Sequence, residues 1–145
     1  MEWETYKKIS QYLPLVNSVY LSGWGEPLLH KRLVDMVKVA KEAGCYVGFT
    51  TNGTLLTYEI SKKLVDLNLD LIEISLDGAT PQTYEEIRKG AKFKNVIDNI
   101  STLISLKHKV RKAKPKVMLS FLMMKKNINE LSLIVDLALS NTSHI

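Results

Sequence analysis

Apolar residues recur along the chain with two different spacings. Helical spacing, with apolar side chains three or four residues apart, is found in five segments: 3–13, 33–40, 58–67, 93–104 and 131–138. Short and largely apolar runs, typical of buried strands, lie between them at 17–22, 45–50, 69–76 and 116–123. The pattern therefore predicts strands and helices in alternation.

Residues with strong local preferences mark several of the boundaries. Pro14 ends the first helical pattern, and Gly44 is a plausible left-handed cap after the second. Thr80 followed by Pro81 forms a good N-cap and first-turn pair, and the helix that they open should end near Gly90.

Strands alternating with helices are typical of right-handed βαβ units and a parallel sheet. No linker or break in composition divides the chain, so residues 1–145 are interpreted as one domain. Four strands are too few to close an eight-stranded barrel. We therefore expect either an open α/β sheet or part of a larger assembly of strands.

Composition excludes several classes of protein. The chain has 145 residues, 46% hydrophobic and 24% charged, as expected of a globular domain. No apolar run approaches the roughly 20 residues that span a bilayer, and the first residues do not resemble a signal peptide, so the cytoplasm is the expected location. The single cysteine, Cys45, excludes an internal disulfide framework and is expected to be a small buried side chain. The histidines lack metal-ligand spacing: His30, His108 and His144.

The net charge of +5 comes from one segment. Residues 107–116 read KHKVRKAKPK and contain six Lys or Arg and no acid. Such a run can bind nucleic acid, or it can be a solvated connection between a helix and a strand. The second interpretation is favoured because no aromatic residues interleave the run and no nucleic-acid motif accompanies it.

Candidate chemistry follows the strands, since ligands of parallel α/β folds bind at the carboxyl ends of the strands. The four segments there are SGWGEP (22–27), TNG (51–53), SLDG (75–78) and MMKKN (123–127). Gly25 allows a ligand to approach the backbone closely, and Glu26 offers a carboxylate. Leu28 stands where a dinucleotide fingerprint needs glycine, so that motif is excluded. Glu26 and Asp77 are either paired carboxylates for acid–base chemistry or, more commonly, caps of turns and strand ends.

Four of these segments together resemble the radical S-adenosylmethionine enzymes. They are LSGWGEPLLH, FTTNGTLL, IEISLDGATPQTYEEIRKGAKFKNVIDNI, and a strand followed by MKKNINEL. They occur in the family's order and at its spacing over nearly the whole chain. The resemblance implies a partial, TIM-like (β/α) barrel. It also implies binding of S-adenosylmethionine against a four-iron, four-sulfur cluster, with reductive cleavage to a 5′-deoxyadenosyl radical.

The resemblance implies site residues by position. Gly25 and Glu26 match the segment that receives the methionine amino group, and Ser75 matches a contact to the methionine or ribose portion. Arg88 matches an arginine that meets the carboxylate in several relatives; alternatively, it is a surface arginine paired with Glu85. The segment of Thr51 and Asn52 matches a position that faces substrate or cofactor.

The chain departs from the family at the cluster. The family holds its cluster with three cysteines in a C-x-x-x-C-x-x-C loop, which this sequence lacks, and cluster iron requires thiolate ligands. We therefore expect a core fragment that is inactive as it stands, with no metal ligands and no catalytic residue of its own. The alternative functions are a non-catalytic S-adenosylmethionine-binding module, or a nucleic-acid-binding α/β module that uses residues 107–116.

The same resemblance predicts sheet order 1-2-3-4 with helices on the outer face and an inner face left partly open. An exposed apolar face favours association. The expected outcome is a homodimer through that face, or packing of the N-terminal helix across it. The substrate cannot be predicted, no membrane partner is expected, and nucleic acid is not the favoured partner.

Overall fold

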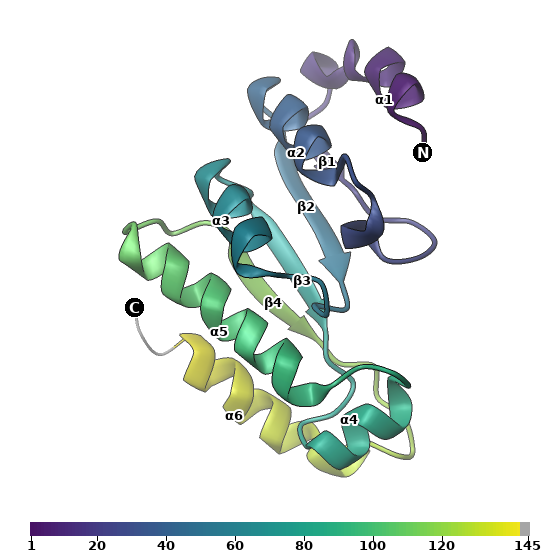
Figure 1. Cartoon of the computed structure of the whole chain (residues 1–145), viewed down its shortest axis with the longest axis vertical. Helices are drawn as coiled ribbons and strands as arrows, with labels where there is room; N and C mark the ends of the chain where they lie inside the picture. The colour runs from purple at the N-terminus through teal and green to yellow at the C-terminus, as the bar shows by residue number, and fades with distance from the viewer. Residues whose placement is uncertain (143–145) are drawn as a thin grey trace.

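A computed structural model of the chain describes residues 1–142 and has one four-stranded sheet (Figure 1). All three strand pairs are parallel, and the spatial order is β1-β2-β3-β4. The strands are β1 (Ser18–Tyr20), β2 (Tyr46–Thr51), β3 (Leu71–Ser75) and β4 (Lys116–Ser120). The predicted α/β class, strand number and strand order are therefore confirmed.

The helices alternate with the strands and gather on one face of the sheet (Figure 1). Their bounds are α1 (Trp3–Ser10), α2 (Leu33–Glu42), α3 (Tyr58–Asp66), α4 (Pro81–Ile87), α5 (Phe93–Lys109) and α6 (Leu131–Thr142). Short 3-10 turns lie at Leu13–Leu15, Pro27–Leu29 and Ile128–Glu130. None of the helices within residues 1–142 is long and apolar enough to cross a membrane.

The two faces of the sheet differ because side chains alternate along each strand. Beneath the helices lie fully buried apolar side chains, which form the core: Val47, Phe49, Ile72 and Ile74. The opposite face exposes large side chains, among them Tyr20, Tyr46 and Met118. Glu73 and Ser75 alternate with the buried isoleucines, so they point to this open face.

Two of the predicted helix boundaries are observed and one is wrong. The Thr80 hydroxyl accepts a hydrogen bond from the Thr83 amide, and Gly44 has a φ of +85°. The first helix, however, ends at Ser10 rather than at Pro14. Pro14 instead sits early in a separate 3-10 turn, where its fixed φ and missing N–H are tolerated.

α1 packs beside α2 rather than across the open face. The Tyr6 hydroxyl donates to the Met36 carbonyl at 2.8 Å, and the Arg32 guanidinium lies 4.4 Å from the centre of the Trp3 ring. The open face is therefore not covered by the N-terminal helix. Self-association through that face stays a prediction.

α4 lies very close to the chain that leaves β3. A Cβ built on Gly78 would come within 2.5 Å of the Tyr84 amide nitrogen, so only glycine fits there. The Glu130 carboxylate holds the start of the helix, accepting bonds from the Ala79 amide and from the hydroxyls of Thr80 and Thr83 at 2.6–2.7 Å. These contacts fix the position of α4, which ends at Ile87, directly before Arg88.

A buried carboxylate joins the amino-terminal ends of the strands. Asp70, directly before β3, accepts hydrogen bonds from Lys41 at 2.6 Å, Lys114 at 2.5 Å and the Val47 amide at 2.8 Å. Burial opposes ionisation of Asp70, but these bonds outweigh it and lower the pKa of the carboxyl. One side chain thus links α2, β2 and the segment that precedes β4.

We expect Asp70→Asn to lower the free energy of unfolding at pH 7 by about 2 kcal/mol, since hydrogen bonds to charged groups are lost. A carboxyl with a lowered pKa stabilises the fold above its unfolded-state pKa of about 4, and the effect is lost as the pH falls through the folded-state value. The difference in free energy of unfolding between variant and wild type should therefore become smaller below about pH 4.

Urea unfolding monitored by circular dichroism between pH 7 and pH 3 measures this difference. The matched control is Asp66→Asn, because Asp66 forms an exposed pair with Lys62 and should contribute little. Equal effects of the two substitutions would contradict the role given to Asp70.

Candidate functional site

A cleft of about 380 Å³ lies at the carboxyl ends of the first three strands. Its volume lies within the range of small-molecule sites. It is lined by the loop after β1, by the carboxyl ends of β2 and β3, and by the residues that follow β2 and α4: Ser22, Gly23, Gly25, Glu26, Thr50, Thr51, Asn52, Ser75 and Arg88. All six candidate site residues from the sequence analysis line this one cleft: Gly25, Glu26, Thr51, Asn52, Ser75 and Arg88.

Glu26 joins the first two loops of the cleft. Its Oε1 accepts hydrogen bonds from the Leu28 amide at 3.0 Å and the Thr51 hydroxyl at 2.6 Å, and its Oε2 accepts from the Asn52 amide at 2.8 Å. Both carboxylate oxygens are therefore used within the protein. The structure favours the capping interpretation of Glu26 over acid–base chemistry.

Thr51 and Asn52 shape the second loop through contacts within the protein. The Thr51 side chain is buried; its hydroxyl donates to Glu26 and accepts from the Gly53 amide. Asn52 Oδ1 accepts from the amide and hydroxyl of Thr54, closing a tight turn. These hydrogen bonds fix the shape of the turn between β2 and the segment before α3.

Gly25 is an open backbone position of the cleft. Its φ is +97°, which side chains other than glycine rarely adopt, and a Cβ there would meet nothing within 4 Å. Gly25 lines the cleft and also a neighbouring pocket of about 620 Å³, so a ligand can reach its backbone. Trp24 is fully exposed and lines that neighbouring pocket together with Leu29 and Met36.

Ser22, Gly23 and Thr50 line the cleft but were not nominated from the sequence. Ser22 Oγ accepts a hydrogen bond from the Thr50 amide at 2.8 Å, which joins the loop after β1 to the end of β2. Ser22 and Gly23 lie within the segment SGWGEP and Thr50 within FTTNGTLL, and this was the available signal. Their contacts join positions 28 residues apart, which no local pattern encodes.

Arg88 is held by an aspartate from the end of β3. Its Nε and Nη2 both meet Asp77 Oδ2, at 2.7 and 2.6 Å. Pairing with Glu85, the alternative drawn from the sequence, is wrong. Glu85 instead pairs with Lys92 and accepts from the Phe93 amide.

Below Ser75 on the open face, Glu73 joins three strands. Its carboxylate accepts hydrogen bonds from the Tyr20 hydroxyl at 2.8 Å and the Thr50 hydroxyl at 3.2 Å. The hydrogen bond from Tyr20 is the main cause that lowers the pKa of Glu73, and bonds from Ser120 and Thr50 lower it further against partial desolvation. The open face of the sheet therefore carries an ionised carboxylate below Ser75.

The residues of this chain do not fit an iron–sulfur cluster. Cys45, its one cysteine, is buried, and its thiol donates to the carbonyls of Leu13 and Val16, away from the cleft. Within residues 1–142, no group of three or more His, Cys, Asp or Glu side chains could hold a metal ion. His144 lies outside the described residues.

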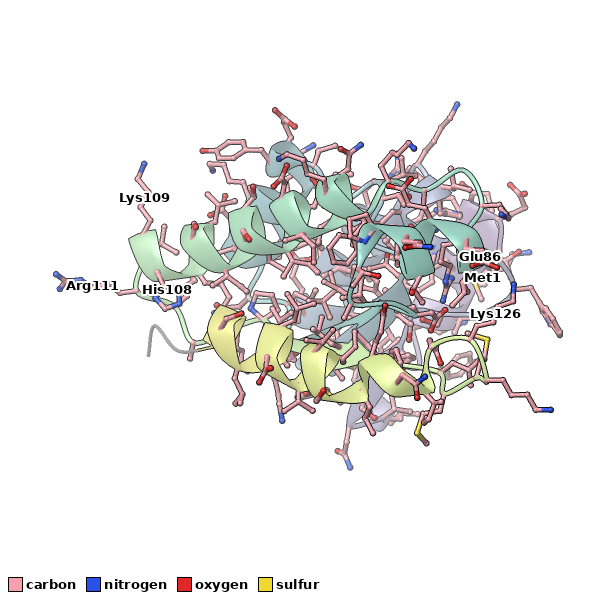
Figure 2. The ribbon with its side chains drawn as sticks, turned by 90° about the horizontal axis from the view of Figure 1, so that it is seen from below. Met1, Glu86, His108, Lys109, Arg111 and Lys126 are labelled. Carbon is pink, nitrogen blue, oxygen red and sulfur yellow. The ribbon has the colours of Figure 1, made fainter. Side chains whose placement is uncertain are left out.

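The basic segment lies far from the cleft. Figure 2 shows His108, Lys109 and Arg111 at one end of the molecule, with Glu86, Lys126 and Met1 at the other. Lys112 Nζ donates to the carbonyls of Val65 and Asp66 at 2.9 and 3.1 Å, and Lys114 pairs with Asp70. Part of the positive charge therefore fastens the connection between α5 and β4.

The fold agrees with the comparisons to known proteins. The family model of the Radical SAM superfamily matches residues 4–138, so the chain belongs to that superfamily. Over 135 residues it is 32% identical to a tungsten-containing aldehyde ferredoxin oxidoreductase cofactor-modifying protein of Pyrococcus furiosus. Over 96 residues it is 40% identical to a GTP 3′,8-cyclase of Limosilactobacillus fermentum.

These relatives are longer than the chain. The matched regions cover 90% of the chain and 38% of the first relative, and 65% of the chain and 28% of the second. The crystal structure of archaeal TYW1 superimposes with a TM-score of 0.65 at 19% identity, over 97% of this chain and 53% of that one. This last likeness establishes the fold alone.

We expect Glu26→Gln to loosen the first two loops of the cleft. All three partners of Glu26 donate hydrogen bonds, so a glutamine NH₂ must face a donor on one side. The local opening free energy should fall by about 1–2 kcal/mol. Amide hydrogen exchange at Leu28 and Asn52 measures this loosening without any ligand.

Glu42→Gln is the matched control, because Glu42 forms only an exposed pair with Lys38, at 3.8 Å. If exchange at Leu28 and Asn52 is the same in Glu26→Gln as in the wild type, Glu26 does not hold the loops together.

Proposed function

We propose that this chain is the S-adenosylmethionine-binding part of a radical S-adenosylmethionine enzyme core, and that its cleft binds that cofactor. The observation that supports the proposal is the convergence of Gly25, Glu26, Thr51, Asn52, Ser75 and Arg88 on one cleft. These residues come from segments up to 63 positions apart, from Gly25 to Arg88. Superfamily membership supports the choice of ligand.

The cleft offers groups suited to both ends of an amino-acid moiety. Backbone carbonyls around Gly25 can accept hydrogen bonds from an ammonium group. The Arg88 guanidinium suits a carboxylate, which it can bind through two parallel N–H bonds. The Ser75 hydroxyl can donate or accept one further bond. In this proposal Glu26 acts indirectly, because its oxygens already hold the loops in place.

We further propose that this chain alone does not cleave S-adenosylmethionine reductively. A cluster of the family's kind requires three thiolates, and the sequence has the single, buried Cys45. No step through a cluster is therefore assigned to its residues. Binding of the cofactor and its cleavage are separate properties here.

Titration calorimetry with S-adenosylmethionine tests the binding proposal. Gly25→Val should abolish binding, because Gly25 lines the cleft and its positive φ does not tolerate a β-branched side chain. Ser75→Ala should weaken binding by about 1 kcal/mol, roughly fivefold in Kd, since one ordinary hydrogen bond is lost.

Gly44→Val is the matched control for Gly25→Val. Gly44 has a similar φ of +85° and equally open space around its Cβ position, but it follows α2 at the other end of the sheet. Normal binding by Gly25→Val, or equal loss in Gly44→Val, would contradict the proposed cleft.

Anaerobic reconstitution with iron and sulfide tests the second proposal. We expect no stoichiometric cluster and no 5′-deoxyadenosine after reduction in the presence of S-adenosylmethionine. Iron and sulfide analysis together with chromatography of the products measure both. A stoichiometric cluster on this chain would overturn the proposal.

A further inference from the structure

We propose that Asp77 is a positioning residue that aims the Arg88 guanidinium at the carboxylate of the bound ligand. Asp77 would thereby determine the preference of the cleft for carboxylate-bearing sulfonium ligands. The inference rests on the proposed function and assigns a role to a residue that does not itself line the cleft.

The contacts of Arg88 are one-sided. Nε and Nη2 both meet Asp77 Oδ2, while Arg88 lines the cleft with about a third of its side chain exposed. The guanidinium group is planar. Contacts that fix one of its edges, through Nε and Nη2, therefore also fix the direction of the remaining N–H groups on Nη1 and Nη2. An arginine held in this way loses less rotamer freedom when a ligand binds.

Asp77 is itself firmly held. Its side chain is almost fully buried, and its Oδ1 accepts the Leu122 amide at 3.1 Å. The buried Asn127 side chain donates to the carbonyls of Asp77 and Leu122 at 3.0 and 2.8 Å. The end of β3 is thus fastened to the loop after β4, and Arg88 is attached to this assembly.

Asp77 also has no donor to offer a ligand. Both carboxylate oxygens accept bonds from within the protein, Oδ1 from Leu122 and Oδ2 from Arg88. Its negative charge would repel a ligand carboxylate on contact. Any contribution of Asp77 to the affinity for such a ligand must therefore pass through Arg88.

The test compares two ligands, S-adenosylmethionine and its decarboxylated form, which lacks only the carboxylate. In Asp77→Asn an amide NH₂ must face either the guanidinium or the Leu122 amide, both donors, so one of these two contacts is lost. Any remaining hydrogen bond to the guanidinium no longer joins two opposite charges, so the guanidinium is held less firmly. Calorimetry measures the ratio of the affinity for S-adenosylmethionine to the affinity for its decarboxylated form. In Asp77→Asn this ratio should be about tenfold lower than in the wild type. A merely structural loss would weaken both ligands equally.

A double variant separates positioning from a direct effect. Arg88→Ala should reduce the same ratio at least as much, and adding Asp77→Asn to Arg88→Ala should change it no further. Asp70→Asn is the matched control, since Asp70 is another buried aspartate with basic partners but lies at the far end of the sheet. If Asp77→Asn does not fold, Asp77→Glu keeps the charge, displaces it by one methylene, and should lower the ratio less.

An unchanged ratio in the Asp77 variants, or additive losses in the double variant, would overturn the inference while leaving the proposed function intact. Absence of S-adenosylmethionine binding by the wild-type chain would overturn the proposed function, and this inference with it.

Discussion

The architecture depends on one constraint, which is that a parallel sheet must bury at least one face. Here the helices cover the face of Val47, Phe49 and Ile72 and leave the face of Tyr20 and Glu73 open. Because side chains alternate, each strand delivers apolar residues to the core and polar residues to the open face. The loops that follow the strands then meet at one edge, where they form the cleft.

Two carboxylates give that edge its shape. Glu26 joins the loop after β1 to the loop after β2, and Asp77 joins the end of β3 to Arg88 and to the loop after β4. Both carboxylates accept hydrogen bonds from groups of the protein through each of their two oxygens. Glu26 and Asp77, which the sequence offered as candidate acid–base groups, therefore connect the segments of the site. Backbone atoms, Ser75 and Arg88 are among the groups that can still meet a ligand.

Much of the fold could be predicted from the sequence, since the spacing of hydrophobic residues and the turn residues are local signals. They specified the four strands, the parallel order and the cap at Thr80. What they could not specify are side-chain partners chosen across long separations. Arg88 lies three residues from Glu85 but pairs with Asp77, because Glu85 is taken by Lys92 and Asp77 is presented by the neighbouring strand end. The early end of the first helix has a local cause, because Pro14 lies in a separate 3-10 turn.

The central claim is that one cleft, built from the loops after three strands, binds S-adenosylmethionine. Mapping of ¹⁵N-labelled protein by NMR during a titration with that ligand tests it most directly. The account predicts shifts of the amides of Gly25, Asn52 and Ser75 and of the Arg88 side-chain Nε–H, with the amides of 107–116 unchanged. Shifts centred on 107–116, or no shifts at saturating ligand, would contradict it.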